Sequence, residues 1–182
     1  LAGFPCQPFS HAGLKKGLKD KRGNLFFTIR DIIKEHQPEV FLLENVPGLN
    51  THDNEKTIKR MHAELNDIGY DFDKKILAAK SFNLPQRRRR LYIVGFKNKL
   101  SQKKFEFPEP IKQTKKFRNI LEKKPDSKYT ISDRLWIGHQ ERKKRNIKRG
   151  VGFGYAIFDE TCDYVNTMSA RYNKDGSEIL IA

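Results

Sequence analysis

The feature that most constrains the fold is a continuous apolar run at residues 40–43 (VFLL), which ends abruptly in Glu44. A strand that is apolar at consecutive positions is typical of a central strand covered on both faces. Residues 25–36 before it and about 54–68 after it carry apolar side chains at helical spacing. Residues 71–79 and 91–96 then read as strands. This alternation predicts an α/β fold, with helices on the faces of a sheet.

An unusual cysteine follows another strand-like segment at the start of the chain. Residues 1–4 read as the end of a buried strand, and Cys6 comes next, with Pro5 before it and Pro8 after it. Proline restricts its own backbone and that of the preceding residue, so the thiol is held in a defined direction, as a nucleophile requires. The alternative is an inert, buried cysteine in a turn. Because ligands bind at the carboxyl ends of strands in α/β sheets, the position of Cys6 there favours a functional thiol.

Two further groups of charged residues stand next to predicted strands. Glu44 ends an apolar strand, where a carboxyl group is costly to bury without a partner and can be tuned to hold a proton. A helix cap or a structural ion pair is the alternative. Residues 87–90 are four arginines directly before a strand. Alternation along a strand would place Arg88 and Arg90 on one face, where they could clamp a carboxylate, a base edge or a phosphate. A solvated charged face is the alternative.

The charge balance favours a polyanionic partner. Lys and Arg number 37 against 22 acidic residues, which gives a net charge of +15. A basic soluble protein without such a partner, or one that touches acidic membrane surfaces, would have the same composition. No apolar run is long enough to span a membrane. Cys6 and Cys162 lie far apart, which gives no disulfide framework and fits a reducing cytoplasm, with Cys162 as a structural thiol.

The second half of the chain has a different character. From residue 97 onward, basic clusters such as residues 142–145 alternate with aromatic side chains, and apolar runs are few. We expect a small, mostly β or irregular domain over residues 97–182, after an α/β domain over residues 1–96. The chain begins with Leu1 inside a strand-like segment, so we interpret it as part of a longer protein.

Three motifs in order resemble the cytosine-5 DNA methyltransferase family of the bacterial type. Residues 3–10 (GFPCQPFS) resemble its catalytic loop, residues 44–46 its E-N-V motif, and residues 86–90 its Q-x-R-x-R motif. The resemblance implies a partial Rossmann-like, S-adenosylmethionine-dependent methyltransferase sheet followed by a target-recognition domain. Residues 169–180 resemble the end of that recognition region in members that modify the inner cytosine of short CC-containing palindromes. A site such as CCGG or CCNGG is therefore expected.

The resemblance also implies roles for individual residues. Cys6 would add to carbon 6 of a flipped-out cytosine, and the electron density on carbon 5 would attack the methyl group of S-adenosylmethionine. Glu44 would hold or protonate ring nitrogen 3, Arg88 would orient Glu44, and Arg90 would contact the base carbonyl. No metal is implied. The remaining expected contacts are the cofactor pocket for Pro5 and Leu25, and the DNA or the base for Phe4 (through its carbonyl), Gln7 (filling the vacated space), Ser10 (at a phosphate) and Asn45.

The expected protein is a DNA cytosine-5 methyltransferase of a restriction-modification or orphan system, acting as a monomer on double-stranded DNA in the bacterial cytoplasm. The family's glycine-rich cofactor loop normally precedes the catalytic cysteine, and further motifs follow the recognition region. We therefore expect this chain to hold the catalytic half of the site and to lack most of the cofactor site. Two alternatives remain: a related tRNA cytosine-5 methyltransferase, whose loop tends to end in threonine where Ser10 stands, and a truncated pseudoenzyme that only binds DNA.

Overall fold

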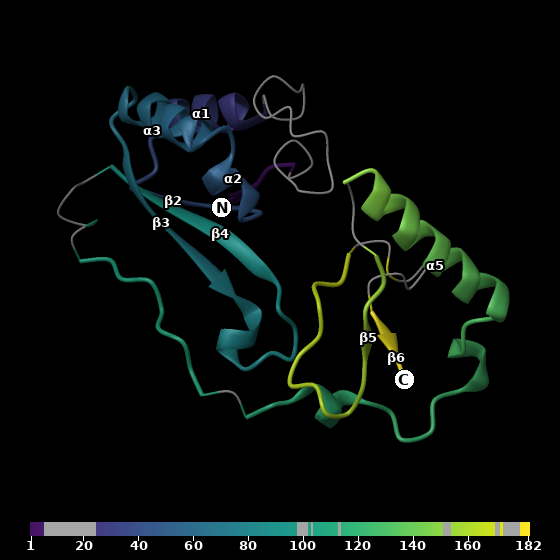
Figure 1. The fold of residues 1–182 in the computed structure, drawn as a ribbon. Helices are drawn as coiled ribbons and strands as arrows, with labels where there is room; N and C mark the ends of the chain where they lie inside the picture. The colour runs from purple at the N-terminus through teal and green to yellow at the C-terminus, as the bar shows by residue number, and fades with distance from the viewer. Residues whose placement is uncertain are drawn as a thin grey trace. The chain divides into compact units, whose positions relative to one another are not determined.

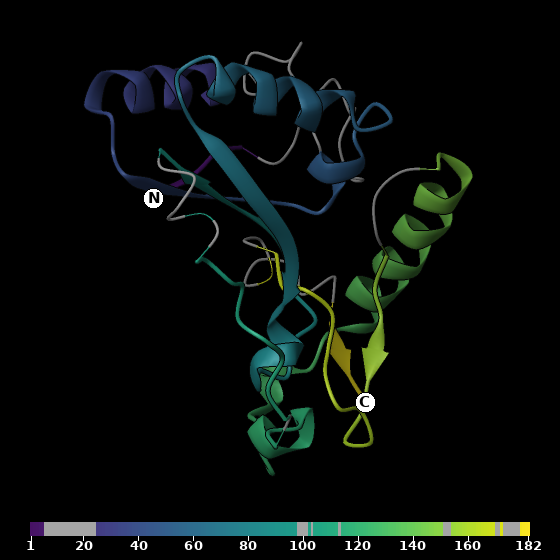
Figure 2. The same ribbon diagram turned by 90° about the vertical axis from the view of Figure 1, so that its left-hand side faces the viewer.

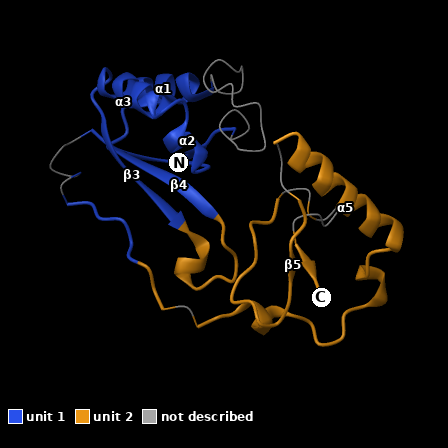
Figure 3. Cartoon of the chain, in the orientation of Figure 1, with its two compact units in different colours: residues 1–77, 89–109 blue, residues 78–88, 110–182 orange. Residues whose placement is uncertain are grey.

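The computed structural model describes residues 1–5, 25–97, 102, 104–112, 114–150, 154–169, 172 and 179–182. The chain forms two compact units, residues 1–77 with 89–109 and residues 78–88 with 110–182 (Figure 3). The boundary expected after residue 96 differs from this division in two places. Residues 78–88 belong to the second unit although they lie between two strands of the first, and the first unit extends to Glu109.

The first unit contains a four-stranded sheet in the order β1-β2-β4-β3 (Figure 1). Its strands are β1 (Ala2–Gly3), β2 (Val40–Asn45), β3 (Asp71–Ala78) and β4 (Arg89–Phe96). β1 runs parallel to β2, and β4 runs antiparallel to β2. The strands predicted at residues 40–43, 71–79 and 91–96 are confirmed, and β4 begins two residues earlier than predicted.

The helices of this unit are α1 (Leu25–His36), α2 (Gly48–Thr51) and α3 (Lys56–Asn66). The helix predicted at residues 25–36 is confirmed. The one predicted from about Asn54 begins only at Lys56, because Asp53, Asn54 and Glu55 have positive φ angles that a helix cannot accommodate. Gly69, at φ +90°, lies in the turn that follows α3.

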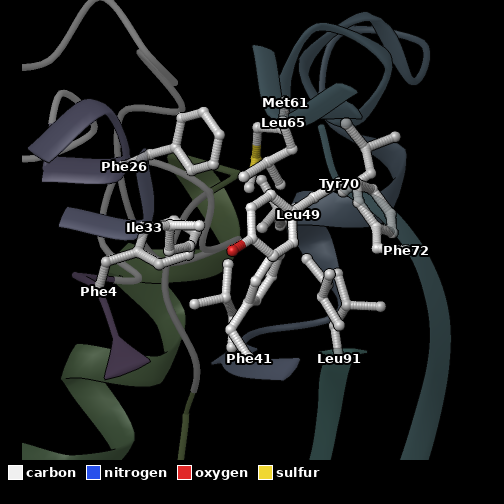
Figure 4. Packing of buried hydrophobic residues seen from close by; sticks show 13 residues of the cluster. Phe4, Phe26, Ile33, Phe41, Leu49, Met61, Leu65, Tyr70, Phe72 and Leu91 are labelled. Carbon is white, nitrogen blue, oxygen red and sulfur yellow. The ribbon is translucent and has the colours of Figure 1, made fainter. Parts of the chain in front are cut away.

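The core lies between the sheet and the two longer helices, which pack on the same side of it (Figures 1 and 2). Alternate residues of β2 and β4 face this core, including Leu43 and Ile93 as well as Phe41 and Leu91, which are labelled in Figure 4. On the opposite face Val40 is 48% exposed. On that same face Val94 and Phe96 of β4 are 7% and 5% exposed, and the Phe96 ring lies 5.3 Å from the Phe105 ring. The second face of β2 is therefore covered only in part, since α1 and α3 both lie on the other face.

The second unit contains one long helix and only two short strands among its described residues. Its elements are the two-stranded parallel pair β5 (Ile157–Phe158) and β6 (Leu180–Ile181), the 3-10 turns η2 (Ala79–Phe82), η3 (Phe117–Ile120) and η4 (Ser127–Tyr129), and the helix α5 (Asp133–Lys148). Buried Phe117, Val165 and Ile179 form a small core.

The expectation of a mostly β or irregular domain missed α5, which has 16 residues. The Ser132 side chain caps this helix by accepting from the Leu135 amide at 3.3 Å. Asp133 in the first turn and basic residues in the last turn match the helix dipole. Within the described residues, no helix combines the length and the apolar character needed to cross a membrane.

Candidate active site

Glu44 and Arg90 form a charge pair at the end of β2. The antiparallel register pairs Glu44 with Tyr92, so Arg90, two residues away on β4, is its diagonal neighbour on the same face of the sheet. Arg90 Nε lies 2.7 Å from Glu44 Oε1, and the two side chains are 19% and 35% exposed. Water is thus partly excluded from the pair. Under these conditions a charge-assisted hydrogen bond is strong.

This pairing differs from the one that the family resemblance implied. Orientation of Glu44 was expected from Arg88, whereas the guanidinium group that contacts Glu44 belongs to Arg90. Arg88 is exposed and precedes β4, and its carbonyl accepts from the Ala79 amide at 3.1 Å. Arg88 belongs to the second unit, so its expected place on the face of Arg90 stays a prediction.

Asn45 holds the backbone at the end of β1. Its side chain is 1% exposed, and its Nδ2 donates to the Phe4 carbonyl at 3.1 Å. Its Oδ1 accepts from the Val46 amide at 2.9 Å. The Phe4 ring, 6% exposed, packs against Phe26 with ring centroids 6.3 Å apart. Asn45 was expected to contact DNA or the base, but in the structure its amide binds the backbone instead.

A small residue lies beside the carboxyl group of Glu44. Gly3 pairs with Glu44 in the parallel register of β1 and β2. A Cβ atom added to Gly3 would lie 3.8 Å from Glu44 Oε2. One carboxyl oxygen of Glu44 is therefore bound by Arg90, and the other lies near the end of the strand that leads toward Cys6.

The remaining predicted residues divide into two groups. Pro5 is partly buried directly after Phe4, and Leu25, the first residue of α1, is 43% exposed. Cys6, Gln7 and Ser10 lie outside the described residues.

Sequence reasoning did not include Tyr92, which stands opposite Glu44. Side chains alternate between the two faces of a strand, and this alternation, already applied to Arg88 and Arg90, would have placed Tyr92 on the face of Arg90. Among the described residues, no group of three or more His, Cys, Asp or Glu side chains could hold a metal ion.

Comparison with known proteins identifies the family. The model of the C-5 cytosine-specific DNA methylase family matches residues 1–181. The chain therefore belongs to the C-5 cytosine-specific DNA methylase family, and the resemblance found in its motifs is confirmed.

Curated bacterial proteins are about half identical to this chain over the residues that align with it. Type II methyltransferase M.DsaV of Dactylococcopsis salina is 50% identical over 182 residues, which cover 100% of this chain and 52% of that protein. M.NlaX of Neisseria lactamica is 53% identical over 180 residues, 99% of this chain and 57% of that protein. M.SsoII of Shigella sonnei is 53% identical over 183 residues, with 100% and 48% covered. The chain spans about half the length of the curated relatives it matches.

Solved structures share the fold at low sequence identity. The methyltransferase EhMeth of Entamoeba histolytica gives a TM-score of 0.65 at 19% identity, covering 95% of this chain and 50% of that one. The S. pombe Dnmt2 methyltransferase gives 0.62 at 22% identity, covering 98% and 55%. These likenesses show the fold alone, and they confirm the mixed α/β architecture.

Proposed function

We propose that this chain is the catalytic and recognition part of a DNA cytosine-5 methyltransferase that modifies carbon 5 of cytosine in double-stranded DNA. The observation that carries the proposal is the Arg90–Glu44 pair at the end of β2, next to the backbone that leads into Cys6. The family match over residues 1–181 and the Type II methyltransferases at about 50% identity support the same reaction.

The methyl donor in this proposal is S-adenosylmethionine, which supplies an electrophilic methyl group. Pro5 and Leu25 would hold it. Leu25 exposes apolar surface at the start of α1, and Pro5 follows the end of β1, so both fit an apolar part of the cofactor. No metal has a part in the reaction as proposed.

The chemistry at the base begins with Cys6. Its thiolate adds to carbon 6 of a cytosine flipped out of the duplex, and the electron pair of the 5,6 double bond moves to carbon 5, which takes the methyl group. Loss of the proton on carbon 5 then expels the thiolate and restores the double bond. Glu44 holds ring nitrogen 3, where negative charge would otherwise develop, and Arg90 fixes the Glu44 carboxyl group in place.

The other predicted contacts complete the site. The Phe4 carbonyl, which accepts from Asn45, would also accept from the exocyclic amine of cytosine. Gln7 fills the space that the flipped base leaves, Ser10 holds a phosphate, and Arg88 contacts the substrate or supports the pair. The first compact unit is then the catalytic part and the second the target-recognition part.

The biological setting is proposed with the reaction. Relatives named as Type II methyltransferases favour a bacterial, cytoplasmic restriction-modification or orphan system acting on a CC-containing palindrome such as CCGG or CCNGG. The family match, to C-5 cytosine-specific DNA methylases, favours DNA over tRNA as substrate. The basic second unit supports duplex DNA as the partner, with the enzyme bound as a monomer.

Labelled methyl transfer tests this function. The full-length protein is expected to transfer methyl groups from S-adenosylmethionine to duplex DNA, Cys6→Ser to abolish transfer, and Glu44→Gln to slow it by about 10²–10⁴-fold. Residues 1–182 alone are expected to show little or no turnover. Transfer to tRNA only, or full activity of Cys6→Ser, would overturn the proposal, and DNA binding without any transfer would identify a pseudoenzyme.

A further inference from the structure

One face of the helix α5, called the inner face, packs against other residues of the second unit. His139 is 3% exposed, and the Trp136 ring meets the Tyr155 ring at 4.7 Å between centroids. Lys143 also lies on this face, since its Nζ donates to the Tyr155 carbonyl at 3.1 Å and stands 4.3 Å from that ring. A Cβ atom added to Gly154 would come within 2.5 Å of the Lys143 stem, so the stem lies directly on the backbone there.

The opposite side of α5 is basic and solvent-exposed. We define the outer face as Arg134, Glu141, Lys144, Arg145 and Lys148, all of which are exposed. Helical geometry places these positions away from the side of Trp136, His139 and Lys143. Glu141 is the one acidic group of this set, and its carboxylate lies 3.8 Å from Arg145 Nη1. Within the described residues, Arg134, Lys144 and Lys148 have no carboxylate within ion-pairing distance.

The length and charge of this face match a nucleic-acid backbone. From Arg134 to Lys148 the helix rises by about 21 Å. A DNA strand presents one phosphate for about every 3.4 Å of helix axis, so several phosphates fall within that length. Exposed lysine and arginine side chains without rigid partners suit phosphate contacts better than the reading of base edges.

A membrane surface fits this helix less well. Helices that lie in a membrane interface turn a broad apolar face into the lipid. In α5, Tyr155 packs against the face opposite the cations, and the exposed apolar side chains Leu135, Ile137 and Ile147 are spread around the helix instead of forming one broad face. Attraction between the cations of this face and an anionic partner is therefore the source of affinity, as it is in sequence-independent DNA binding.

We propose that the outer face of α5 binds the phosphate backbone of duplex DNA without reading its sequence. This inference rests on the proposed function, which supplies duplex DNA as the substrate. Lys143 adjoins Lys144 in the sequence but has no part in that contact. Its ammonium group contacts the carbonyl and the ring of Tyr155 within the second unit.

The salt dependence of DNA binding by the full-length protein tests the inference. The triple variant Lys144→Gln, Arg145→Gln, Lys148→Gln is compared with the wild type on two unrelated 30-bp duplexes over a series of salt concentrations. The slope of log K against log salt is negative, and each lost phosphate contact should reduce its magnitude by about 0.9 and weaken binding about eightfold at 0.1 M salt. Both duplexes should lose affinity by the same factor.

Lys143→Gln is the matched control, since it removes the same charge from the adjacent position. It is expected to lower the thermal midpoint and to leave the salt slope unchanged. Circular dichroism of the triple variant should show wild-type helix content. An unchanged slope in the triple variant, a loss confined to one duplex, or a loss of binding only to vesicles of phosphatidylserine and phosphatidylcholine would each overturn the inference.

Methyl transfer by the wild type separates this inference from the proposed function. If the wild type methylates DNA and the triple variant keeps the full salt slope, the role of α5 is wrong and the function stands. If the wild type binds DNA without methylating it and the slope falls in the variant, the role of α5 stands and the proposed reaction is wrong.

Discussion

Asn45 Nδ2 donates to the Phe4 carbonyl across 3.1 Å, which joins two segments 41 residues apart in the sequence. The same side chain accepts from the Val46 amide, so its donor and its acceptor both bind backbone. Phe4 immediately precedes Pro5 and Cys6, and Asn45 immediately follows Glu44. The bond therefore fixes the backbone before the proposed nucleophile relative to the strand end that carries the proposed acid.

Asn45→Asp should destabilise the protein, because it removes the donor to the Phe4 carbonyl at a position that is 1% exposed. Leaving a buried polar group without its partner costs about 1–3 kcal/mol. Urea unfolding measures the change. Asn66→Asp is the matched control, since Asn66 is exposed at the end of α3 and its substitution should change the free energy of unfolding by less than about 0.5 kcal/mol. Equal effects of the two substitutions would contradict the structural role of Asn45.

The pair Arg90–Glu44 should behave as one unit in catalysis. Arg90→Met is expected to lower kcat for methyl transfer strongly in the wild-type background, and only weakly when Glu44 is already Gln. A double-mutant cycle should give a coupling energy of about 1–3 kcal/mol. Arg89→Met is the control, because Arg89 is exposed and only its backbone carbonyl contacts Arg90. Multiplicative losses in the double variant would mean that Arg90 acts on the substrate independently of Glu44.

Local patterns predicted those elements whose apolar residues repeat regularly. The helix at residues 25–36 follows from such a repeat, whereas the strand at residues 40–43 follows from a continuous apolar run. The start of α3 could not be predicted, since three consecutive positive φ angles at residues 53–55 depend on a turn that the apolar pattern does not record. The helix α5 was missed because cations, rather than apolar residues, occupy much of its length.

Long-range pairing explains what else the sequence left open. Arg88 and Arg90 have the same spacing from their neighbours and the same chemistry, so nothing local says which of them contacts Glu44. The register of β2 against β4 decides it, by placing Arg90 diagonally across from Glu44. The contact of Asn45 with DNA or the base was implied by the family resemblance, and its bond to the Phe4 carbonyl, 41 residues away in the sequence, is recorded in no local pattern.

Tyr70 should make stability depend on pH in the alkaline range. Its hydroxyl donates to the Pro38 carbonyl at 2.6 Å, and burial, with a smaller contribution from Glu39, raises the pKa of Tyr70 above its ordinary value of 10.0. A raised pKa in the folded state means that the unfolded chain ionises first. The stability contributed by the neutral phenol is therefore complete below about pH 10 and is lost as the pH rises through the folded-state value.

Tyr70→Phe should remove this alkaline dependence and cost about 1–2 kcal/mol at pH 7 through the lost hydrogen bond. Urea unfolding between pH 7 and pH 11 measures both effects. Tyr129→Phe, at a position that is 68% exposed, is expected to change neither of them. Identical pH profiles for the wild type and Tyr70→Phe would show that Tyr70 does not ionise in this range in a way linked to folding.

Two glycines should respond to alanine in opposite directions. A Cβ atom on Gly95 would come within 2.0 Å of the Phe41 ring, which lies over β4 at this position, whereas a Cβ atom on Gly138 in α5 would meet nothing within 4 Å. Gly95→Ala should therefore cost at least about 1–3 kcal/mol through overpacking. Gly138→Ala should raise the free energy of unfolding by about 0.5–1 kcal/mol, because alanine loses less backbone entropy than glycine in a helix.

Phe41→Leu is expected to recover part of the stability lost in Gly95→Ala when the two substitutions are combined, since it vacates the space that the new methyl group needs. Thermal and urea unfolding of Gly95→Ala, Gly138→Ala and the combined variant, and of Phe41→Leu alone, measure these changes. A Gly95→Ala protein as stable as the wild type would show that Phe41 does not cover that backbone in solution.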